Sequence, residues 1–245
     1  MYSGRLNIWN RHAFPLAQSI CKEFAINIIH QITPIEFRAI GKYGKISDIK
    51  FVCGPLGGGE FIPSGLKYYA RGHVLIEMVR SVSNRWYRFK FRVTGKLNQC
   101  DYIMFANEET RDFLIKGWEQ KLKINNKPIT ETALDIMEEE EQFDEKKDNK
   151  KCVFFAAGRM IYRKGYELLL DALAKVPGEL NYTLRIAGNG PELIKLQAIC
   201  SRNLNLTNHV SFIGGRKYPE IINEYNNADV FVMPSIRETT GTVLL

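Results

Sequence analysis

The sequence is poor in the features that mark disulfide-bonded and zinc-binding proteins. Its cysteines, Cys21, Cys53, Cys100, Cys152 and Cys200, are odd in number and widely spaced. They form no Cys-x-x-Cys pair and no histidine-bearing cluster, which argues against both a disulfide framework and a zinc site. A reducing compartment is therefore the natural setting.

Long apolar runs are also missing. No stretch approaches the roughly 20 apolar residues that a transmembrane helix needs, and the first residues lack the apolar core of a signal peptide. We therefore expect a cytoplasmic protein, at most peripheral to an anionic membrane, that neither spans a membrane nor carries a visible export signal.

What the chain does have is enough apolar material for a sizeable core. Its 245 residues, 45% of them hydrophobic, suit one large domain or two smaller ones. The formal net charge is +7, and most of the basic surplus lies in residues 1–137. Such a surface would suit nucleic acid, an anionic membrane, phosphorylated substrates or water alone, and charge by itself does not choose among them.

A charged tract divides the chain. Residues 138–151 are acidic and then mixed in charge, with almost nothing to bury, and are typical of a linker. We therefore predict one domain over residues 1–137 and a second over residues 152–245.

The second part has a regular alternation of short apolar runs and helical periodicity. Expected strands cover residues 152–157, 182–187, 210–213 and 230–233, and expected helices cover residues 165–176, 191–203 and 218–227. This alternation predicts βαβ units and a parallel sheet covered on both faces.

The first part is less regular. Expected strands cover residues 25–32, 49–53, 101–106 and 129–136, a long helix covers residues 65–91, and the chain opens in a helix. Four strands are few for a complete doubly wound domain, and we expect both domains to be incomplete.

A glycine-rich turn with three cations follows the expected strand at residues 152–157. In Gly158-Arg159-Met160-Ile161-Tyr162-Arg163-Lys164-Gly165, the glycines allow close backbone approach and the cations offer charge-assisted hydrogen bonds. The turn is a candidate phosphate site, and a solvated turn is the alternative. Gly188-Asn189-Gly190-Pro191 and Gly214-Gly215-Arg216 follow the next two strands, and each could equally be a simple connector.

Glu238 lies just beyond the last expected strand, which Pro234-Ser235 ends. Open α/β sheets bind ligands at the carboxyl ends of their strands. The ordered series Gly-Arg with Lys-Gly, Gly-Asn-Gly-Pro-Glu, Phe-Ile-Gly and Ala-Asp-Val-Phe-Val-Met-Pro-Ser-x-x-Glu resembles the donor domain of family 4 retaining glycosyltransferases over nearly all of residues 152–245.

The resemblance implies a GT-B fold, in which two Rossmann-like parallel-sheet domains face a cleft. It makes Glu238 a catalytic residue that contacts the hydroxyls of the donor sugar, and no cofactor or metal is expected. The donor-binding positions that it implies are Arg159, Lys164, Gly188, Asn189, Gly190, Arg216, Thr239, Thr240, Gly241 and Thr242. The family's second glutamate would fall at position 246, so we expect the natural sequence to continue with Glu there.

Two segments of the first part also resemble the family. Ile28-Ile29-His30-Gln31-Ile32-Thr33-Pro34 resembles a strand-end motif whose histidine would make His30 catalytic, although a lone histidine after a buried strand can be purely structural. The loop Gly57-Gly58-Gly59 resembles one that lies toward the interdomain cleft in a subset of these enzymes, or its glycines serve only backbone clearance.

Basic and aromatic residues interleave along the expected helix. The residues are Arg80, Arg85, Arg88, Lys90 and Arg92 with Trp86, Tyr87, Phe89 and Phe91. The mixture suits an anionic membrane interface. Alternatively, the aromatic rings are core and the cations reach outward, which we favour. No recognisable nucleic-acid module surrounds the segment, and we expect no nucleic-acid partner.

The resemblance therefore implies transfer of a sugar from a nucleoside-diphosphate sugar to a glycan or lipid-linked acceptor, with retention of configuration. We expect this chain itself to be a weak or inactive enzyme that still binds the donor. A GT-B epimerase or phosphorylase, and a non-catalytic nucleotide-sugar or membrane-binding module, stay open as alternatives.

Overall fold

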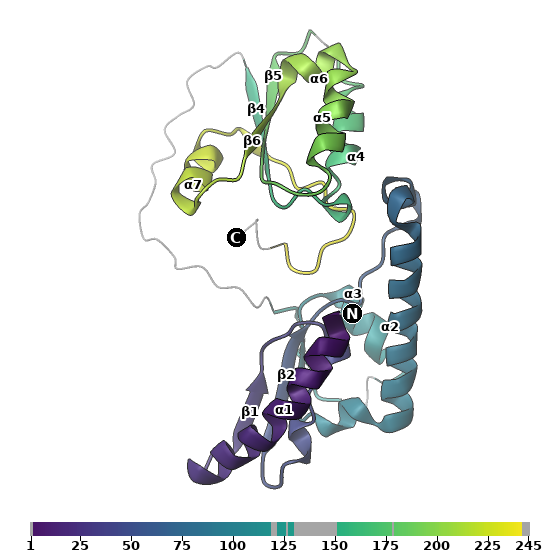
Figure 1. Ribbon diagram of the computed structural model, residues 1–245, viewed down its shortest axis with the longest axis vertical. Coiled ribbons are helices and arrows are strands. Elements are labelled where there is room, and N and C mark those ends of the chain that lie inside the picture. The colour runs from purple at the N-terminus through teal and green to yellow at the C-terminus, as the bar shows by residue number, and fades with distance from the viewer. Residues whose placement is uncertain (1, 119–121, 126, 130–150, 178, 242–245) are drawn as a thin grey trace.

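The chain forms two α/β modules (Figure 1). The computed structural model describes residues 2–118, 122–125, 127–129, 151–177 and 179–241. The predicted linker, residues 138–151, lies outside the described residues except for Lys151. Within the described residues, no helix is long and apolar enough to cross a membrane.

The first module has a parallel sheet in the order β1-β2-β3. Its strands are β1 (Ile28–Gln31), β2 (Lys50–Leu56) and β3 (Tyr102–Phe105), and its helices are α1 (Tyr2–Glu23), α2 (Val74–Thr94) and α3 (Glu108–Ile115). Short 3₁₀ segments are η1 (Phe37–Ala39), η2 (Tyr43–Lys45), η3 (Ser64–His73) and η4 (Lys96–Gln99). The core joins side chains of β2 and β3 to η1 and α2, as the edge-on contact of Phe37 with Phe91 illustrates.

Local chemistry defines the helix ends in this module. Gly95 ends α2 in the left-handed region at φ 60°, where its N–H bonds the carbonyl of Phe91. Asn107 caps α3 by accepting the N–H of Thr110 at 2.8 Å, and two glutamates stand in the first turn of that helix, where the helix dipole favours negative charge.

The second module has a four-stranded parallel sheet in the order β6-β5-β4-β7. The strands are β4 (Cys152–Ala157), β5 (Tyr182–Ala187), β6 (Val210–Gly214) and β7 (Val230–Phe231). The helical segments are η6 (Tyr162–Lys164), α4 (Tyr166–Leu173), α5 (Leu193–Ser201), α6 (Leu204–His209) and α7 (Tyr218–Asn226).

Helices cover both faces of this sheet. Figure 1 shows α4, α5 and α6 on one side and α7 on the other. Successive residues of β4 serve the two faces, because Ala156 joins the core under α4 and α5 while Phe155 packs edge-on against Tyr225 of α7. The predicted parallel sheet covered on both faces is confirmed.

Several predicted boundaries were wrong. The strand expected at 25–32 begins only at Ile28, because the N–H groups of Phe24 and Ile26 bond carbonyls of α1 and Ala25 has a positive φ of 51°. The strand expected at 230–233 ends at Phe231. The helix expected at 165–176 is shorter, and the one expected at 65–91 is a 3₁₀ segment followed by α2.

One further difference concerns an element rather than an end. Helix α6 was not predicted; the side chain of Asn203 caps it by accepting the N–H of Leu206 at 3.2 Å. Of the strand expected at 129–136, only Ile129 is described, and its N–H donates to the carbonyl of Phe105 at the end of β3 at 3.0 Å. Earlier in the chain, Ile124 forms a bridge with Ile103 of the same strand.

Candidate functional site

The strand order of the second module places two loops side by side. The chain runs from β4 through β5 to β6 at one edge, and then returns to place β7 on the other side of β4. Where the winding direction reverses, loops at the carboxyl ends of adjacent strands diverge and leave room for a ligand. The loop after β4 contains Arg159 and Lys164, and the loop after β7 contains Glu238.

Backbone contacts join these two loops directly. The N–H of Ile236 donates to the carbonyl of Arg163 at 2.9 Å. Gly165 has φ +70°, and a Cβ there would lie 1.9 Å from the carbonyl oxygen of Pro234. Only glycine fits so close to the other chain segment, and this contact fixes Lys164 beside the last loop.

Glu238 lies at the centre of a charged cluster. Lys164 donates a hydrogen bond from Nζ to Glu238 Oε2, which also accepts from Ser235 Oγ at 3.2 Å. The other carboxylate oxygen accepts the N–H of Thr239 at 3.3 Å and lies 3.8 Å from Arg163. The carboxylate therefore has partners on both oxygens.

The environment of Glu238 keeps it ionised. Burial disfavours its charged form, but the hydrogen bond and positive charge of Lys164, the N–H of Thr239 and the charge of Arg163 outweigh that cost. The pKa of Glu238 is therefore below its usual value. A fixed negative charge is thus paired with a lysine from the neighbouring loop.

Arg159 is exposed on the same turn as Lys164, and no side-chain hydrogen bond or ion pair involves it within the described residues. The turn after β5 packs against the same region, because a Cβ on Gly188, at φ +129°, would lie 2.0 Å from the carbonyl oxygen of Gly158. The carbonyl of Asn189 accepts the N–H of Met160 at 2.9 Å. The β4 and β5 turns thus form one surface.

The turn after β6 continues that surface. The N–H of Gly188 donates to the carbonyl of Gly214 at 2.7 Å, and Gly190 lies against Met160. Gly215 packs close to the side chain of Asn189, and Arg216 is exposed next to it. The turns that carry Arg159, Gly188 to Gly190 and Arg216 therefore pack against one another.

Thr239 reaches the first module. Its carbonyl accepts the side-chain amide of Asn107 at 2.9 Å, and its methyl group packs against Gly57. Thr240 is half-buried, Gly241 is buried with φ +59°, and Thr242 lies outside the described residues. The glycine loop at 57–59 is therefore in contact with the loop that carries Glu238.

Sequence reasoning missed the group that supports this contact. Glu60 is only 2% exposed, and its carboxylate accepts the N–H of Gly58 and the amide of Asn107, both at 2.8 Å. Arg80 of α2 also bonds this loop, donating to the carbonyls of Glu60 and Gly58. A glutamate next to three glycines was the available signal, but its partners are distant in sequence.

A second contact joins the modules at the beginning of α2. Glu77 accepts hydrogen bonds from Arg237, at 3.0 Å, and from the hydroxyl of Tyr162. His73 stacks on the Tyr162 ring with centroids 4.0 Å apart. Burial and the neighbouring carboxylate raise the pKa of Tyr162, which keeps its hydroxyl protonated as a donor. The loops carrying Lys164 and Glu238 are thus both held from the first module.

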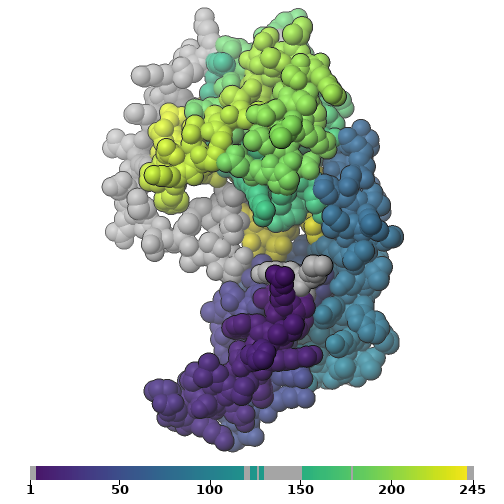
Figure 2. All heavy atoms as spheres, in the orientation of Figure 1, coloured from purple at the N-terminus to yellow at the C-terminus, as the bar shows by residue number. Residues whose placement is uncertain are grey.

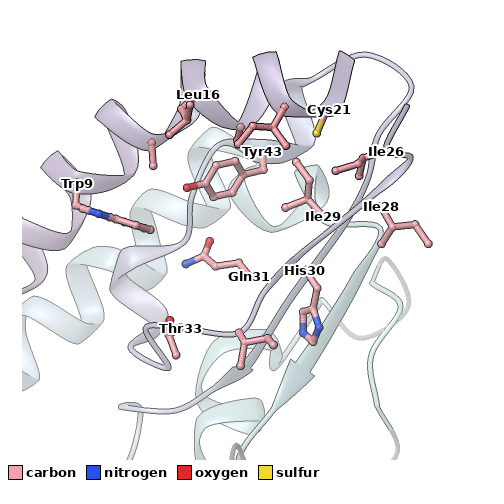
Figure 3. Close-up of a pocket in the computed structure, with 14 residues that line it drawn as sticks. Trp9, Leu16, Cys21, Ile26, Ile28, Ile29, His30, Gln31, Thr33 and Tyr43 are labelled. Carbon is pink, nitrogen blue, oxygen red and sulfur yellow. The ribbon is translucent and has the colours of Figure 1, made fainter. Parts of the chain in front are cut away.

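His30 lies elsewhere. It is exposed on β1, and its Nε2 lies 2.8 Å from the carbonyl oxygen of Gly54. It lines a cavity of about 490 Å³ formed by residues 9–43, chiefly of α1 and β1. Figure 3 shows Ile29 and Gln31 pointing toward α1, with His30 on the other side of the strand. Its contacts in the described structure do not include the Glu238 cluster.

The paired parallel-sheet modules define a GT-B fold, the architecture of a class of glycosyltransferases. The lipopolysaccharide outer core galactosyltransferase WaaB has the same fold, with a TM-score of 0.57 and 16% sequence identity over 96% of this chain and 57% of WaaB. HepE of Anabaena, solved with UDP and glucose, has a TM-score of 0.54 and 16% identity over 98% of this chain and 60% of its own.

Sequence comparison agrees for the second module. Residues 137–245 match the family described as "Glycosyl transferases group 1". An uncharacterized glycosyltransferase of Methanocaldococcus jannaschii is 36% identical over 98 residues, which are 40% of this chain and 25% of the relative. The lipopolysaccharide core biosynthesis glycosyltransferase LpsE of Rhizobium meliloti is 28% identical over 130 residues, 53% of this chain and 35% of LpsE. The chain thus spans about a quarter to a third of the length of these curated relatives.

Proposed function

We propose that this chain is part of a family 4 retaining glycosyltransferase, which moves a sugar from a nucleoside-diphosphate sugar to a glycan or lipid-linked acceptor. The observation that carries the proposal is the pairing of Lys164 with Glu238 at the switch point of the sheet, with Arg159 exposed on the same turn as Lys164. The family match over residues 137–245 supports it independently.

The charges at this site suit the departure of a diphosphate. When the bond from the sugar to the diphosphate breaks, negative charge develops on the leaving group and positive charge on the anomeric carbon. Arg159 and Lys164 would stabilise the leaving group, and preorganised groups of this kind contribute about 3 to 4 kcal/mol each. This chemistry needs no metal ion, because the cations come from the chain.

Glu238 would hold the sugar. A diphosphate at the β4 turn competes with the Glu238 carboxylate for Lys164. The carboxylate keeps its bonds to Ser235 and the N–H of Thr239, so it stays ionised and can accept hydrogen bonds from sugar hydroxyls. The turn at Thr239, Thr240, Gly241 and Thr242 would approach the sugar or the diphosphate.

The names of similar proteins favour a carbohydrate acceptor. LpsE is described as a lipopolysaccharide core glycosyltransferase, and the HepE structure contains UDP and glucose. UDP is therefore the first nucleotide to test. A glycan or a lipid-linked glycan is the acceptor that we propose, on the side of the first module.

Calorimetric titration with UDP tests the site. We expect the wild-type chain to bind UDP, and Arg159→Ala and Lys164→Ala each to weaken binding about tenfold or more, because a charge-assisted hydrogen bond contributes about 1.5 to 3 kcal/mol. Arg202→Ala is the matched control, since Arg202 is exposed in the same module away from these turns. Equal affinity in all four proteins would remove the β4 turn from donor binding.

A second assay separates transfer from the alternatives. Incubation of a radiolabelled UDP-sugar with and without a glycan acceptor should give an acceptor-dependent product. A changed sugar nucleotide without acceptor would indicate an epimerase instead, and donor binding with no product under either condition would favour a binding module.

A further inference from the structure

Helix α2 has apolar side chains on two opposite faces. One face packs into the first module through Asn84, Tyr87 and Phe91. The opposite face carries a second set, which we call the outer stripe; its members are Leu75, Val79, Val82, Trp86, Phe89 and Val93. Each is between 59% and 70% exposed. Figure 2 shows α2 along the outer edge of the molecule, beside both modules.

The outer stripe is continuous. Its members are spaced alternately by four and three residues, which keeps them on one side of an α-helix. A surface helix of a globular protein normally has polar residues on the face opposite its buried side. A continuous apolar face of six exposed side chains on a helix about 30 Å long is typical of an interaction surface.

The rim of the outer stripe is cationic. Arg85 and Arg92 flank it on one side and Lys90 flanks it on the other, and all three are exposed. Glu77 is the only acidic residue of α2, and its carboxylate is engaged by Tyr162 and Arg237. Within α2, the exposed charged side chains that border the outer stripe are therefore all positive.

This charge pattern disfavours a second copy of the chain as the occupant. If two outer stripes paired as a coiled coil, Arg85, Arg92 and Lys90 would occupy the flanking positions that normally carry complementary charges. Parallel pairing would set Arg85 against Lys90, and antiparallel pairing would set like residues against each other. Both arrangements repel, whereas an anionic lipid surface complements the cations and accepts the apolar side chains.

We propose that α2 lies on an anionic membrane surface, with its outer stripe in the interface and Arg85, Lys90 and Arg92 among the lipid headgroups. Trp86 and Phe89, whose rings lie 6.1 Å apart, are the aromatic residues that would enter the headgroup region. The same helix contacts the loops carrying Lys164 and Glu238 through Glu77. This interface does not depend on the proposed transferase activity.

Co-sedimentation with vesicles tests the proposal. We expect the wild-type chain to bind phosphatidylglycerol vesicles, to bind phosphatidylcholine vesicles weakly, and to be released by salt. Arg85→Gln with Arg92→Gln should lower the partition coefficient roughly 25-fold, at roughly fivefold for each cation. Val82→Ser with Phe89→Ser should abolish binding, and neither pair removes a buried side chain.

Lys175→Gln with Arg202→Gln is the matched charge control, because both residues are exposed on the second module. This control should bind like the wild type. Absence of binding to anionic vesicles, or equal losses in the control and in the Arg85 and Arg92 variant, would overturn the proposal. Sedimentation velocity without lipid should give a monomer. A dimer abolished by Val82→Ser with Phe89→Ser would instead assign the outer stripe to self-association.

Discussion

The Glu238 carboxylate interacts with a lysine, an arginine, a serine hydroxyl and a backbone N–H. Its side chain is 21% exposed, so solvent reaches the carboxylate and weakens these electrostatic interactions. The arrangement holds a negative charge at a defined point without burying it completely. The donor-binding role that we propose for this site would need both properties.

The lowered pKa of Glu238 predicts a specific pH dependence. Its ionised form is bound more favourably in the folded chain than in the unfolded one. The resulting stability is therefore present above the usual glutamate pKa and is lost as pH falls through the lowered folded value. Relative to Glu238→Gln, the wild type should be more stable at pH 7 by about 1 kcal/mol, and this difference should fade only below pH 4.5.

Urea unfolding of both proteins between pH 3 and pH 7 measures this difference. Glu179→Gln, at an exposed position before β5, provides a comparison for an ordinary surface carboxylate. A stability difference that disappears well above pH 4.5 would contradict the assigned environment of Glu238.

Among the elements, the turns after β4, β5 and β6 show why glycine is needed at the carboxyl edge of the sheet. Each turn touches the next through backbone atoms, so side chains would separate them. The surface that results presents Arg159 and Arg216 on a tightly packed base.

Gly165→Ala should separate the β4 turn from the β7 loop. The added methyl group would meet the carbonyl of Pro234 in a backbone conformation, φ +70°, that alanine rarely adopts. We expect a loss of at least about 1 to 2 kcal/mol in the free energy of unfolding and weaker UDP binding, because Lys164 moves away from Glu238.

Gly72→Ala is the matched control, since a Cβ at Gly72 meets nothing within 4 Å. Chemical denaturation and UDP titration of the two variants provide the measurements. If Gly165→Ala were as stable as Gly72→Ala and bound UDP equally well, the close packing of the two loops would not matter for the site.

Across the whole molecule, two separate contacts connect the modules at the candidate site. The glycine loop and Asn107 hold Thr239, while Glu77 holds Arg237 and Tyr162. The first module thus orients both halves of the charged cluster in the second. This coupling links the first module to the Glu238 cluster.

Asn107→Ser should loosen the contact at Thr239, together with the bond from the Asn107 amide to Glu60, and leave the Glu77 contact in place. Serine keeps a cap for α3 but cannot donate from the position of the Asn107 amide to the carbonyl of Thr239. We expect backbone hydrogen exchange at residues 237–241 to accelerate by up to about tenfold, because one hydrogen bond contributes about 0.5 to 1.5 kcal/mol.

Asn203→Ser supplies the control. Asn203 also caps a helix, α6, and its side chain accepts the N–H of Leu206 within the second module. It should leave exchange at residues 237–241 unchanged. Unaltered exchange in Asn107→Ser as well would mean that this bond does not restrain the loop.

Much of the fold was predictable because its signals are local. Apolar runs bounded by glycine and proline predicted β4, β5 and β6, and helical periodicity predicted α4, α5 and α7. The cap by Asn203 was a local signal too, yet α6 was missed because it directly follows α5. The roles given to the site residues all stay predictions, including those of Glu238, Arg159, Lys164 and His30.

The sequence by itself determined which residues could form strands, tight turns and an anion-binding turn, because a few neighbouring residues define backbone conformation. Only the tertiary structure decided that Lys164 meets Glu238, 74 residues away, since that pairing requires β7 to return beside β4. The buried setting of Glu60 and the two apolar faces of α2 were likewise decided by packing. Periodicity identifies apolar residues, but the surrounding chain determines which of them are covered.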